Sequence, residues 1–588
     1  MPPMPRFTVA LLAAPILLLV GSCTSGGGGP SLLNFLYSTD WTGATTPQSQ
    51  VVRLINPSGG DVLLRSVDNN GGVAQVTFNS VPSGVYEIQV TQYSQPGGQG
   101  AVLGVLRDQA QVSRTSNSYQ TVAQGAVDHV RVVPATATIQ VQRSIQLYAT
   151  ARTAADVATF TPPGSFVWQA LNDRVSVNSD GIVVGQLQGT GIVRATETTS
   201  GQFNSAVITV EAANTTTTKW TIMVFMNAAN DLDQFSDLNV NQMERVANNP
   251  DVRFVVQWKR VQALGFGAPW TGTRRYLVEY DNSSGNGWND VRSELIQDMG
   301  TSVDMGNKDT LRQFASWVQT YYPAQRYVLV IWNHGSGWRL RDPNIGGTRG
   351  VSFDDEFFTY IRTYELAQAL DTPDRLDVVS WDASLMQMIE VAYEIKDRCD
   401  YVVGSEESPP GEGLPYDLVF GPLRTDPDQS TESMLEHFGT GMLQFYGETR
   451  KITQSSVRTS ALPGLATALS GLGQALLNNQ GTYNNEIIAA RQQAQSYSPT
   501  SLRVYRDLRH LTTILSGLIN NAEIDNACTN VISAFDAAIV HNVHNSLSPN
   551  SFGLSVEFGP GTQPYWTEYG LLSLSGATVW DDWLEVSP

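Results

Sequence analysis

Two polar residues follow apolar, strand-like segments in the second half of the chain. His334 comes shortly after residues 327–332, and Ser384 comes shortly after residues 376–381. In an open α/β sheet, sites form at the carboxyl ends of the strands. A histidine and a hydroxyl nucleophile at that edge could carry out acyl transfer, in which the hydroxyl attacks a carbonyl and the histidine handles the protons.

The flanking segments predict the sheet that would position these two residues. Residues 220–226 and 252–258 are continuous apolar runs, as expected of strands that are covered on both faces. Helix-spaced apolar residues at 311–322 precede the strand before His334, and a second helical segment precedes the strand before Ser384. Strand, helix and strand in this order imply parallel crossovers, so the sequence predicts an α/β domain with a mostly parallel sheet.

The N-terminal part predicts all-β structure. Residues 32–125 are rich in Val, Thr, Gly and Ser and contain short alternating runs, which favours a small β-sandwich. It weakly resembles transthyretin-like or carboxypeptidase-regulatory-like domains. Residues 126–213 contain short strands at regular spacing, with a turn signal at Asp180-Gly181, and resemble a bacterial Ig-like β-sandwich. Residues 214–218 form the expected linker to the α/β domain.

The first 31 residues resemble the export signal of a bacterial lipoprotein. Arg6 precedes an apolar run over residues 9–20 that is too short for a comfortable membrane span. Residues 20–23 resemble a lipobox, so we expect a signal peptide over 1–22, lipidation of Cys23 and a Gly-rich tether over 23–31. The alternative is a plain signal peptide with an incidental cysteine. Either way the chain is expected to be exported, and lipidation would anchor it in the cell envelope, facing away from the cytoplasm.

The composition of the chain argues against one class of partner. A chain of 588 residues has room for several domains, and its net charge of -19 argues against nucleic acid, whose phosphates would repel it. Cys399 and Cys528 remain once Cys23 is assigned to lipid. Buried thiols are the expectation for both, and a disulfide between them is the alternative in an exported chain.

Short segments in a fixed order resemble the clostripain family of cysteine peptidases, whose fold is caspase-like. The matching segments are 220–228, 230–232, 333–338, 382–386, 390–396, 401–407, 507–508, 553–556 and 580–584. The resemblance covers residues 219–588 and implies a caspase-like α/β fold for them. The whole chain is therefore expected to be multidomain, with N-terminal all-β sandwich domains before this α/β domain.

The resemblance also implies catalytic roles. His334 would be the catalytic histidine, and the backbone amides of Gly335 and residue 384 would form the oxyanion hole. The family has Asp-Ala-Cys where this chain has Asp382-Ala383-Ser384. A serine hydroxyl is far less acidic than a thiol and needs a base in contact, oriented by a third group. A weak or inactive peptidase is therefore expected; serine catalysis, or an engineered or sequencing-level change, are the alternatives.

Acidic residues near position 384 indicate the substrate. By resemblance, Asp382 and Glu412 line the pocket that accepts Arg or Lys at the cleavage point, because a guanidinium prefers a carboxylate partner. The alternatives are a structural carboxylate at the strand end for Asp382 and a solvated loop charge for Glu412. The predicted partners are peptides or proteins that contain Arg or Lys.

Processing and metal binding are also implied by the family. Family members are often made as zymogens cut at a basic residue after the histidine strand, and Arg349 is the predicted position here. The family is associated with calcium, so calcium is the cofactor that the resemblance implies. However, the chain lacks EF-hand spacing, and structural or solvated charge is the favoured interpretation of the acidic run 354–356. His541 and His544 lack suitably spaced partners, so no metal site is predicted.

Three functions follow from these patterns. The first is a surface-anchored, Arg- or Lys-directed endopeptidase that Ser384 makes weak or inactive. The second is a pseudopeptidase that binds basic peptides through the retained site. The third is an adhesin or envelope scaffold that acts through the Ig-like region, although such domains are more often spacers.

Overall fold

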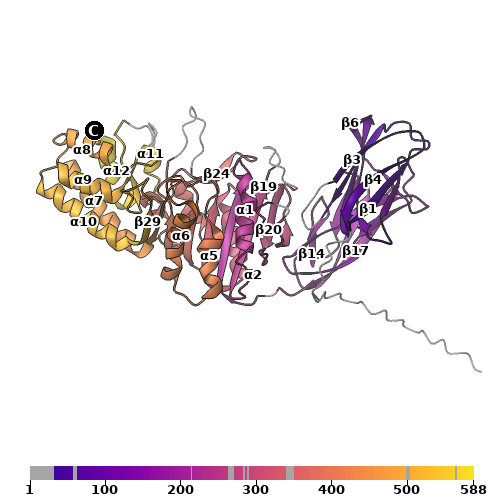
Figure 1. Cartoon of the computed structure of the whole chain (residues 1–588), viewed down its shortest axis with the longest axis horizontal. Coiled ribbons are helices and arrows are strands. Elements are labelled where there is room, and N and C mark those ends of the chain that lie inside the picture. Colours follow the sequence, from indigo (N-terminus) through magenta and orange to yellow (C-terminus); the bar gives the residue numbers. More distant parts are fainter. Residues whose placement is uncertain are drawn as a thin grey trace, which may run out of the picture.

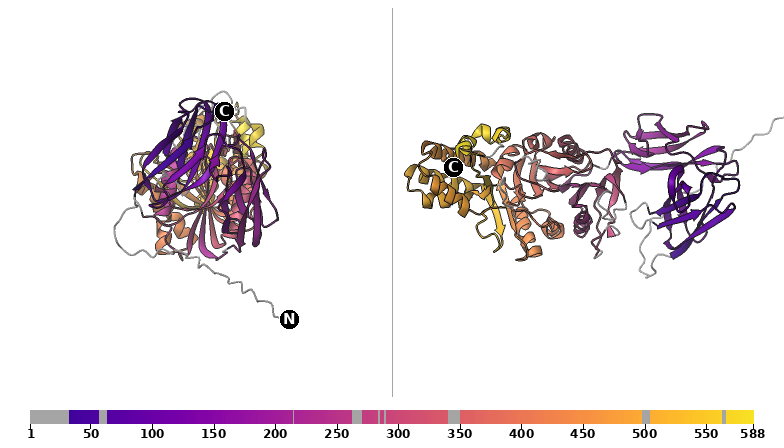
Figure 2. Two further views of the ribbon diagram at one scale, coloured as in Figure 1. Left: turned by 90° about the vertical axis from the view of Figure 1, so that its right-hand side faces the viewer. Right: turned by 90° about the horizontal axis from the view of Figure 1, so that it is seen from above.

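A computed structural model describes residues 32–56, 63–213, 215–261, 270–282, 285–287, 290–339, 350–497, 504–562 and 566–588 of the chain. The predicted signal peptide, Cys23, the Gly-rich tether and Arg349 lie outside the described residues. The molecule is elongated, with β-rich N-terminal domains at one end and the helical C-terminal part at the other (Figures 1 and 2). None of the described helices combines the length and apolar character that crossing a membrane requires.

The first β region packs two sheets around an aromatic core. One sheet has the order β3-β2-β5-β6, and the other begins β4-β1-β7. These strands are β1 (Leu32–Asp40), β2 (Ser49–Ile55), β3 (Leu63–Asp68), β4 (Val73–Pro82), β5 (Gly84–Gln95), β6 (Gln99–Val112) and β7 (Ser118–Val122). Phe35, Tyr37, Trp41 and Phe78 are buried between the sheets, as alternating apolar positions require.

The second β region continues the sheet of the first. Strand β7 pairs in parallel with β12, so a six-stranded sheet, β4-β1-β7-β12-β11-β8, crosses the predicted boundary at residues 125/126. Two further sheets, β10-β15-β14 and β13-β16-β17-β9, complete this region. Its strands are β8 (His129–Val133), β9 (Thr136–Gln140), β10 (Ser144–Gln146), β11 (Tyr148–Arg152), β12 (Ala158–Thr159), β13 (Phe166–Ala170), β14 (Val175–Val177), β15 (Ile182–Gly185), β16 (Gly189–Glu197) and β17 (Phe203–Glu211).

A nine-stranded sheet forms the centre of the C-terminal domain. Its order is β21-β20-β19-β18-β22-β25-β26-β27-β29, and the five central strands from β19 to β26 run parallel. The strands are β18 (Thr218–Ala228), β19 (Val252–Arg260), β20 (Gly272–Leu277), β21 (Glu294–Asp298), β22 (Ala324–Trp332), β25 (Leu376–Asp382), β26 (Cys399–Gly404), β27 (Thr453–Arg458) and β29 (Ile539–His544). Thr218, the last residue of the predicted linker, is the first residue of β18. The mostly parallel sheet confirms the predicted α/β architecture.

Helices cover both faces of this sheet, because successive side chains of a strand point to opposite faces. In β18, Met223 and Phe225 join one core, and Ile222 and Val224 join the other. One face carries α2 (Lys308–Tyr321), α3 (Leu366–Ala369) and α4 (Ile389–Glu394). The same core continues into helices that pack against one another at the C-terminal end of the molecule (Figure 1): α7 (Leu462–Asn478), α9 (Leu508–Leu518), α10 (Ala522–Ala538) and α12 (Trp580–Val586). The other face of the sheet carries α1 (Asp233–Glu244), α5 (Tyr416–Thr425) and α6 (Thr431–Tyr446).

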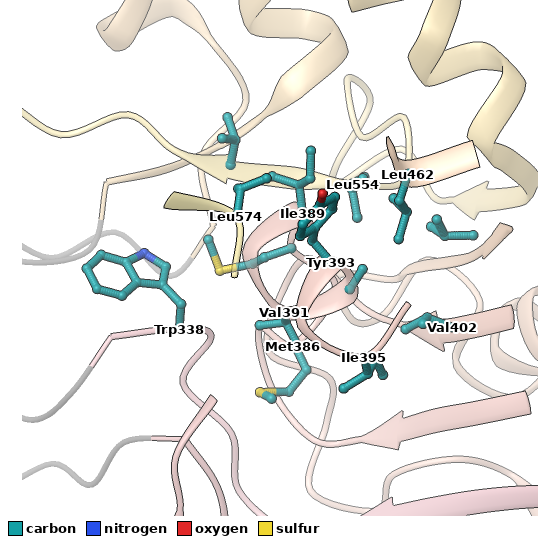
Figure 3. Packing of buried hydrophobic residues seen from close by; sticks show 14 of the residues in the cluster. Trp338, Met386, Ile389, Val391, Tyr393, Ile395, Val402, Leu462, Leu554 and Leu574 are labelled. Atoms are coloured by element: carbon teal, nitrogen blue, oxygen red, sulfur yellow. The ribbon is translucent and has the colours of Figure 1, made fainter. Parts of the chain in front are cut away.

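The larger core ties the middle of the domain to its C-terminal end. Met386 and Ile389, just after the strand that precedes Ser384, pack in one cluster with Leu554 and Leu574 (Figure 3). The remaining short elements are β23 (Val351–Asp354), β24 (Thr359–Ile361), α8 (Asn484–Gln493), β28 (Tyr505–Asp507), β30 (Ser555–Glu557) and α11 (Trp566–Tyr569). Cys399 and Cys528 are free and buried, which confirms the expectation of buried thiols.

The Ig-like region covers one edge of the large sheet. The Ser144 hydroxyl accepts a hydrogen bond from the backbone N–H of Asp298 at 2.9 Å and donates to the carbonyl of Ile296 at 3.4 Å. Arg143 forms an ion pair with Glu294 at 3.1 Å. Unpaired edge strands invite pairing with other chains, so this contact protects β21.

Candidate active site

His334 and Ser384 lie together at the carboxyl edge of the large sheet. Trp332 on β22 is paired with Asp382 on the neighbouring β25, and each of the two site residues follows two positions later. Gly335, next to His334, packs closely on the loop that carries Ser384. A side chain at Gly335 would collide with the carbonyl oxygen of Ser384 and approach Met386 Cγ to 2.9 Å. The two residues that the sequence places after apolar strands are therefore neighbours at one sheet edge.

Asp231 contacts the histidine and was not singled out from the sequence. Its Oδ1 atom lies 2.6 Å from His334 Nε2, and the two side chains are 68% and 39% exposed. Asp231 follows β18, which pairs with the other side of β22 through Met226 and Trp332. A carboxylate just beyond a third apolar strand was the signal available in the sequence.

A second carboxylate lies in the electrostatic environment of this pair. The pKa of Asp355 is raised, first because the group is partly buried and second because of the negative charge of Asp231. The charge of His334 acts in the opposite direction on Asp355. The backbone N–H of Asp355 donates to the carbonyl of Ala229 at 3.0 Å, which holds the two loops together.

Ser384 lies on a strained turn and is partly buried. The next residue, Leu385, has φ +61° although it is fully buried and not a glycine. Such a conformation costs about 1–2 kcal/mol and persists only where the surroundings enforce it. Here the Leu385 N–H donates to the Glu407 carbonyl at 3.4 Å and the Gln387 N–H donates to the Ser405 carbonyl at 3.2 Å.

The hydroxyl of Ser384 and the imidazole of His334 are not hydrogen-bonded to each other in the part of the chain that the structure describes. Nε2 of the imidazole is already engaged by Asp231. A serine nucleophile needs its base in direct contact, because the hydroxyl does not ionise by itself near neutral pH. Ser384, the predicted nucleophile position, therefore lacks the contact that a serine nucleophile would need.

The loop that carries the predicted pocket acid Glu412 packs against the other predicted pocket acid, Asp382. Asp382 is 6% exposed, and its carboxylate accepts hydrogen bonds from Leu414 N–H and Tyr416 O–H, each at 3.0 Å. Burial raises the pKa of Asp382 to about 7, against the opposing effect of these two donors. Gly413, at φ +68°, packs directly on this carboxylate, and Glu412 is only partly buried beside it. Asp382 thus holds the loop that carries Glu412.

Comparison with known proteins identifies the family of this chain. The sequence model of the clostripain family matches residues 224–586. The chain belongs to the clostripain family. This confirms the resemblance and the caspase-like fold that it implied.

The individual family members compared with this chain are distant from it in sequence. The chain is 23% identical over 235 residues to clostripain of Hathewaya histolytica, a match that spans 37% of this chain and only 44% of that protein. A secreted C11 cysteine protease from Bacteroides thetaiotaomicron, solved with an irreversible peptide inhibitor, shares 19% identity with a TM-score of 0.46. An inactive zymogen C11 protease from Parabacteroides distasonis shares 18% identity with a TM-score of 0.47. Each of these structures is covered to 99% and matches 62% of this chain.

The acidic run 354–356, considered above for calcium, has a structural role. Lys259 is completely buried and pairs with Asp354 at 2.7 Å and with Glu356 at 3.0 Å. Within the described ranges, no group of three or more His, Cys, Asp or Glu side chains could hold a metal ion. His541 Nε2 lies 3.0 Å from the carbonyl oxygen of Glu432.

Proposed function

We propose that this clostripain-family protein binds peptides or proteins through Arg or Lys and hydrolyses them slowly or not at all, because Ser384 replaces the nucleophilic cysteine. The observation that carries the proposal is the position of Ser384 at the end of β25, against Gly335, without a hydrogen bond to His334. The backbone amides of Gly335 and Ser384 are the proposed oxyanion donors. Donors of this kind stabilise the developing oxyanion even when the nucleophile is poor.

Recognition of a basic side chain is proposed for Asp382 and Glu412. Both acids act on the hydroxyl of Tyr446, whose pKa is raised mainly by burial and further by their negative charges. A guanidinium or ammonium group that entered this region would gain charge-assisted hydrogen bonds. Its positive charge would also ionise the Asp382 carboxyl, whose pKa of about 7 leaves it partly neutral in the free protein.

Export and anchoring complete the proposal. A signal peptide over residues 1–22 and lipidation of Cys23 would place the protein in the cell envelope. The shared sheet of the two β regions would then act as a spacer between the membrane and the site. Proteolytic processing is proposed at Arg349. The Ser336 N–H donates to the Gly350 carbonyl at 3.2 Å. After a cut at Arg349, this hydrogen bond would still join the segment that follows His334 to the segment that begins at Gly350.

A coumarin-linked Arg peptide tests the peptidase proposal. We expect the full chain to cleave it no more than about tenfold faster than Ser384→Ala, and Ser384→Cys to raise kcat/KM by about 10²-fold or more because histidine readily generates a thiolate. Equal activity of the unsubstituted chain and Ser384→Cys would instead establish a serine peptidase. Inactivity of all three proteins on Arg and Lys substrates would refute the peptidase site.

The retained acids also favour the second candidate, a peptide-binding pseudopeptidase. By resemblance, Asp382, Glu412 and His334 stand at site positions of the family, whereas Ser384 stands where the family has a cysteine. Calorimetry with an uncleaved Arg peptide should then show binding by the full chain that Asp382→Asn weakens. Absence of binding at millimolar peptide would remove this candidate.

A further inference from the structure

We propose that Asp231 is a positioning residue that orients His334 for proton transfer at residue 384. The inference rests on the proposed peptidase function and adds a third group to the two residues that the family resemblance supplies. It starts from the contact of 2.6 Å between Asp231 Oδ1 and His334 Nε2.

The order of the three residues across the sheet fits this role. Asp231 follows β18, His334 follows β22 and Ser384 follows β25, and these strands are consecutive neighbours in the sheet. The histidine therefore stands between an acid and a nucleophile position. With Nε2 bound to Asp231, Nδ1 is the nitrogen that remains to take a proton from residue 384.

Buried asparagines fix the loops that carry this pair. Asn230 and Asn333, the residues just before Asp231 and His334, donate to the same carbonyl oxygen of Phe353, at 2.9 and 3.2 Å. Asn333 also accepts from the Phe353 N–H at 2.8 Å. Both asparagines are 1–3% exposed. Buried hydrogen bonds thus hold the backbone on which Asp231 and His334 are placed, although the two side chains themselves are exposed.

The exposure of the pair indicates that its effect is on chemistry more than on folding. Ion pairs between largely exposed groups contribute little to stability, because solvent screens them. An acid that holds an imidazole in one orientation and tautomer can nevertheless change kcat strongly, as in Ser-His-Asp triads.

These positions define a proton path that runs from residue 384 through His334 Nδ1 to the leaving amine. The hydroxyl of residue 384, or a thiol placed there, loses its proton to Nδ1 while its heteroatom bonds to the scissile carbonyl carbon. The carbonyl π electrons move to the oxyanion. The imidazolium keeps a hydrogen bond from Nε2 to the carboxylate of Asp231, which stays ionised. Nδ1 later gives its proton to the leaving amine as the C–N bond breaks.

The test uses the full chain with Ser384→Cys, to which Asp231→Asn, Asp231→Glu or Asp355→Asn is added. Asp355→Asn is the matched control, because it removes an equal charge near His334 without touching the ring. We expect Asp231→Asn to lower kcat by about 10- to 100-fold and to change KM less than about twofold. This loss in kcat is smaller than that for a buried triad acid, because Asp231 is exposed. Asp231→Glu should recover part of kcat, and Asp355→Asn should change it less than about threefold. Equal losses for Asp231→Asn and Asp355→Asn would overturn the proposal.

Alkylation by iodoacetamide separates this proposal from the peptidase function. Cys399 and Cys528 are buried, and the unsubstituted chain with Ser384 gives the background of all native thiols. Below about pH 7, Asp231→Asn should slow alkylation of the cysteine at 384 severalfold, since the thiolate depends on the imidazolium. If no peptide is cleaved but this slowing occurs, the peptidase function fails and the positioning role stands. An unchanged alkylation rate would overturn the positioning role.

Discussion

Arg339 and Glu557 form a two-pronged ion pair in the interior of the domain. Arg339 Nε lies 2.9 Å from Glu557 Oε2, and Nη2 lies 2.6 Å from Oε1. The two side chains are 4% and 0% exposed, and Trp338 Nε1 donates to the same carboxylate at 3.2 Å. The pair connects the segment after His334 to β30, so the C-terminal part of the chain helps to fix the position of that segment.

Removing one partner of this pair should destabilise the domain strongly. We expect Glu557→Gln to lower the free energy of unfolding by about 3–5 kcal/mol, because the buried Arg339 guanidinium would lose its carboxylate partner. Urea denaturation measures the change. The control is Asp536→Asn at the exposed pair with Arg509, where we expect less than about 1 kcal/mol. A loss for Glu557→Gln no larger than that of the control would contradict the structural role.

A side chain at Gly335 should disturb the site and the fold together. Gly335→Ala would collide with the Ser384 carbonyl, so we expect a cost of about 1–3 kcal/mol and loss of the activity gained in Ser384→Cys. Gly471 on α7 has open space around it and gives the matched control. There, Gly471→Ala should stabilise by about 0.5–1 kcal/mol through helix propensity. Thermal unfolding and peptide cleavage report the two effects, and a neutral Gly335→Ala would show that the two loops are not in close contact.

Much of the site could be predicted from the sequence because it follows strand ends. His334 and Ser384 each follow a continuous apolar run, and parallel strands bring their carboxyl ends to one edge. Asp231 also follows such a run. However, several strands and helices lie between it and His334 in the chain, so local patterns do not reveal that β18 and β22 are neighbours. The positive φ of Leu385 could not be predicted from the sequence either, because only tertiary packing forces a leucine into that backbone conformation.

The fold shows the same division between local and long-range information. Continuous apolar strands and helix spacing predicted the parallel centre of the sheet. The pairing of β7 with β12, which joins the two β regions, depends on a strand of two residues, Ala158–Thr159, that carries almost no pattern of its own. The Ser144 contact with β21 is made by one hydroxyl, which bonds Ile296 and Asp298, the latter 154 residues away in the chain. Contacts of this kind have no periodic signature.

Buried carboxyl groups should make the protein most stable at mildly acidic pH. Burial raises the pKa of Asp382 to about 7 and that of Glu390 to about 8, and it also raises the pKa values of Asp507 and Glu406, which interact with each other. These folded-state values exceed those of the unfolded chain, so the folded state binds more protons between about pH 4 and 8. The stabilisation is complete below the unfolded pKa values and is lost as pH rises through about 7 to 8. Urea midpoints should therefore fall from about pH 5.5 to about pH 8.

Asp382→Asn gives the internal check on this pH dependence. The amide can still meet Leu414 and Tyr416 but does not titrate, so the decline in stability above about pH 6 should become shallower. A decline that is unchanged in Asp382→Asn, or a protein that gains stability between mildly acidic and mildly alkaline pH, would contradict the assignment.

The same substitution separates the structural and recognition roles of Asp382 when citrulline replaces arginine in the substrate. Citrulline keeps the shape of arginine without its charge. In the Ser384→Cys chain, Asp382→Asn should lower kcat/KM for the Arg peptide by about 10²-fold, as expected for a lost charge-assisted pair, and leave the citrulline peptide within about threefold. Glu412→Gln should have a smaller effect of the same kind, because Glu412 is more exposed. Equal losses on both peptides would mean that Asp382 only holds the loop at Leu414 and Tyr416, and that the basic side chain is recognised elsewhere.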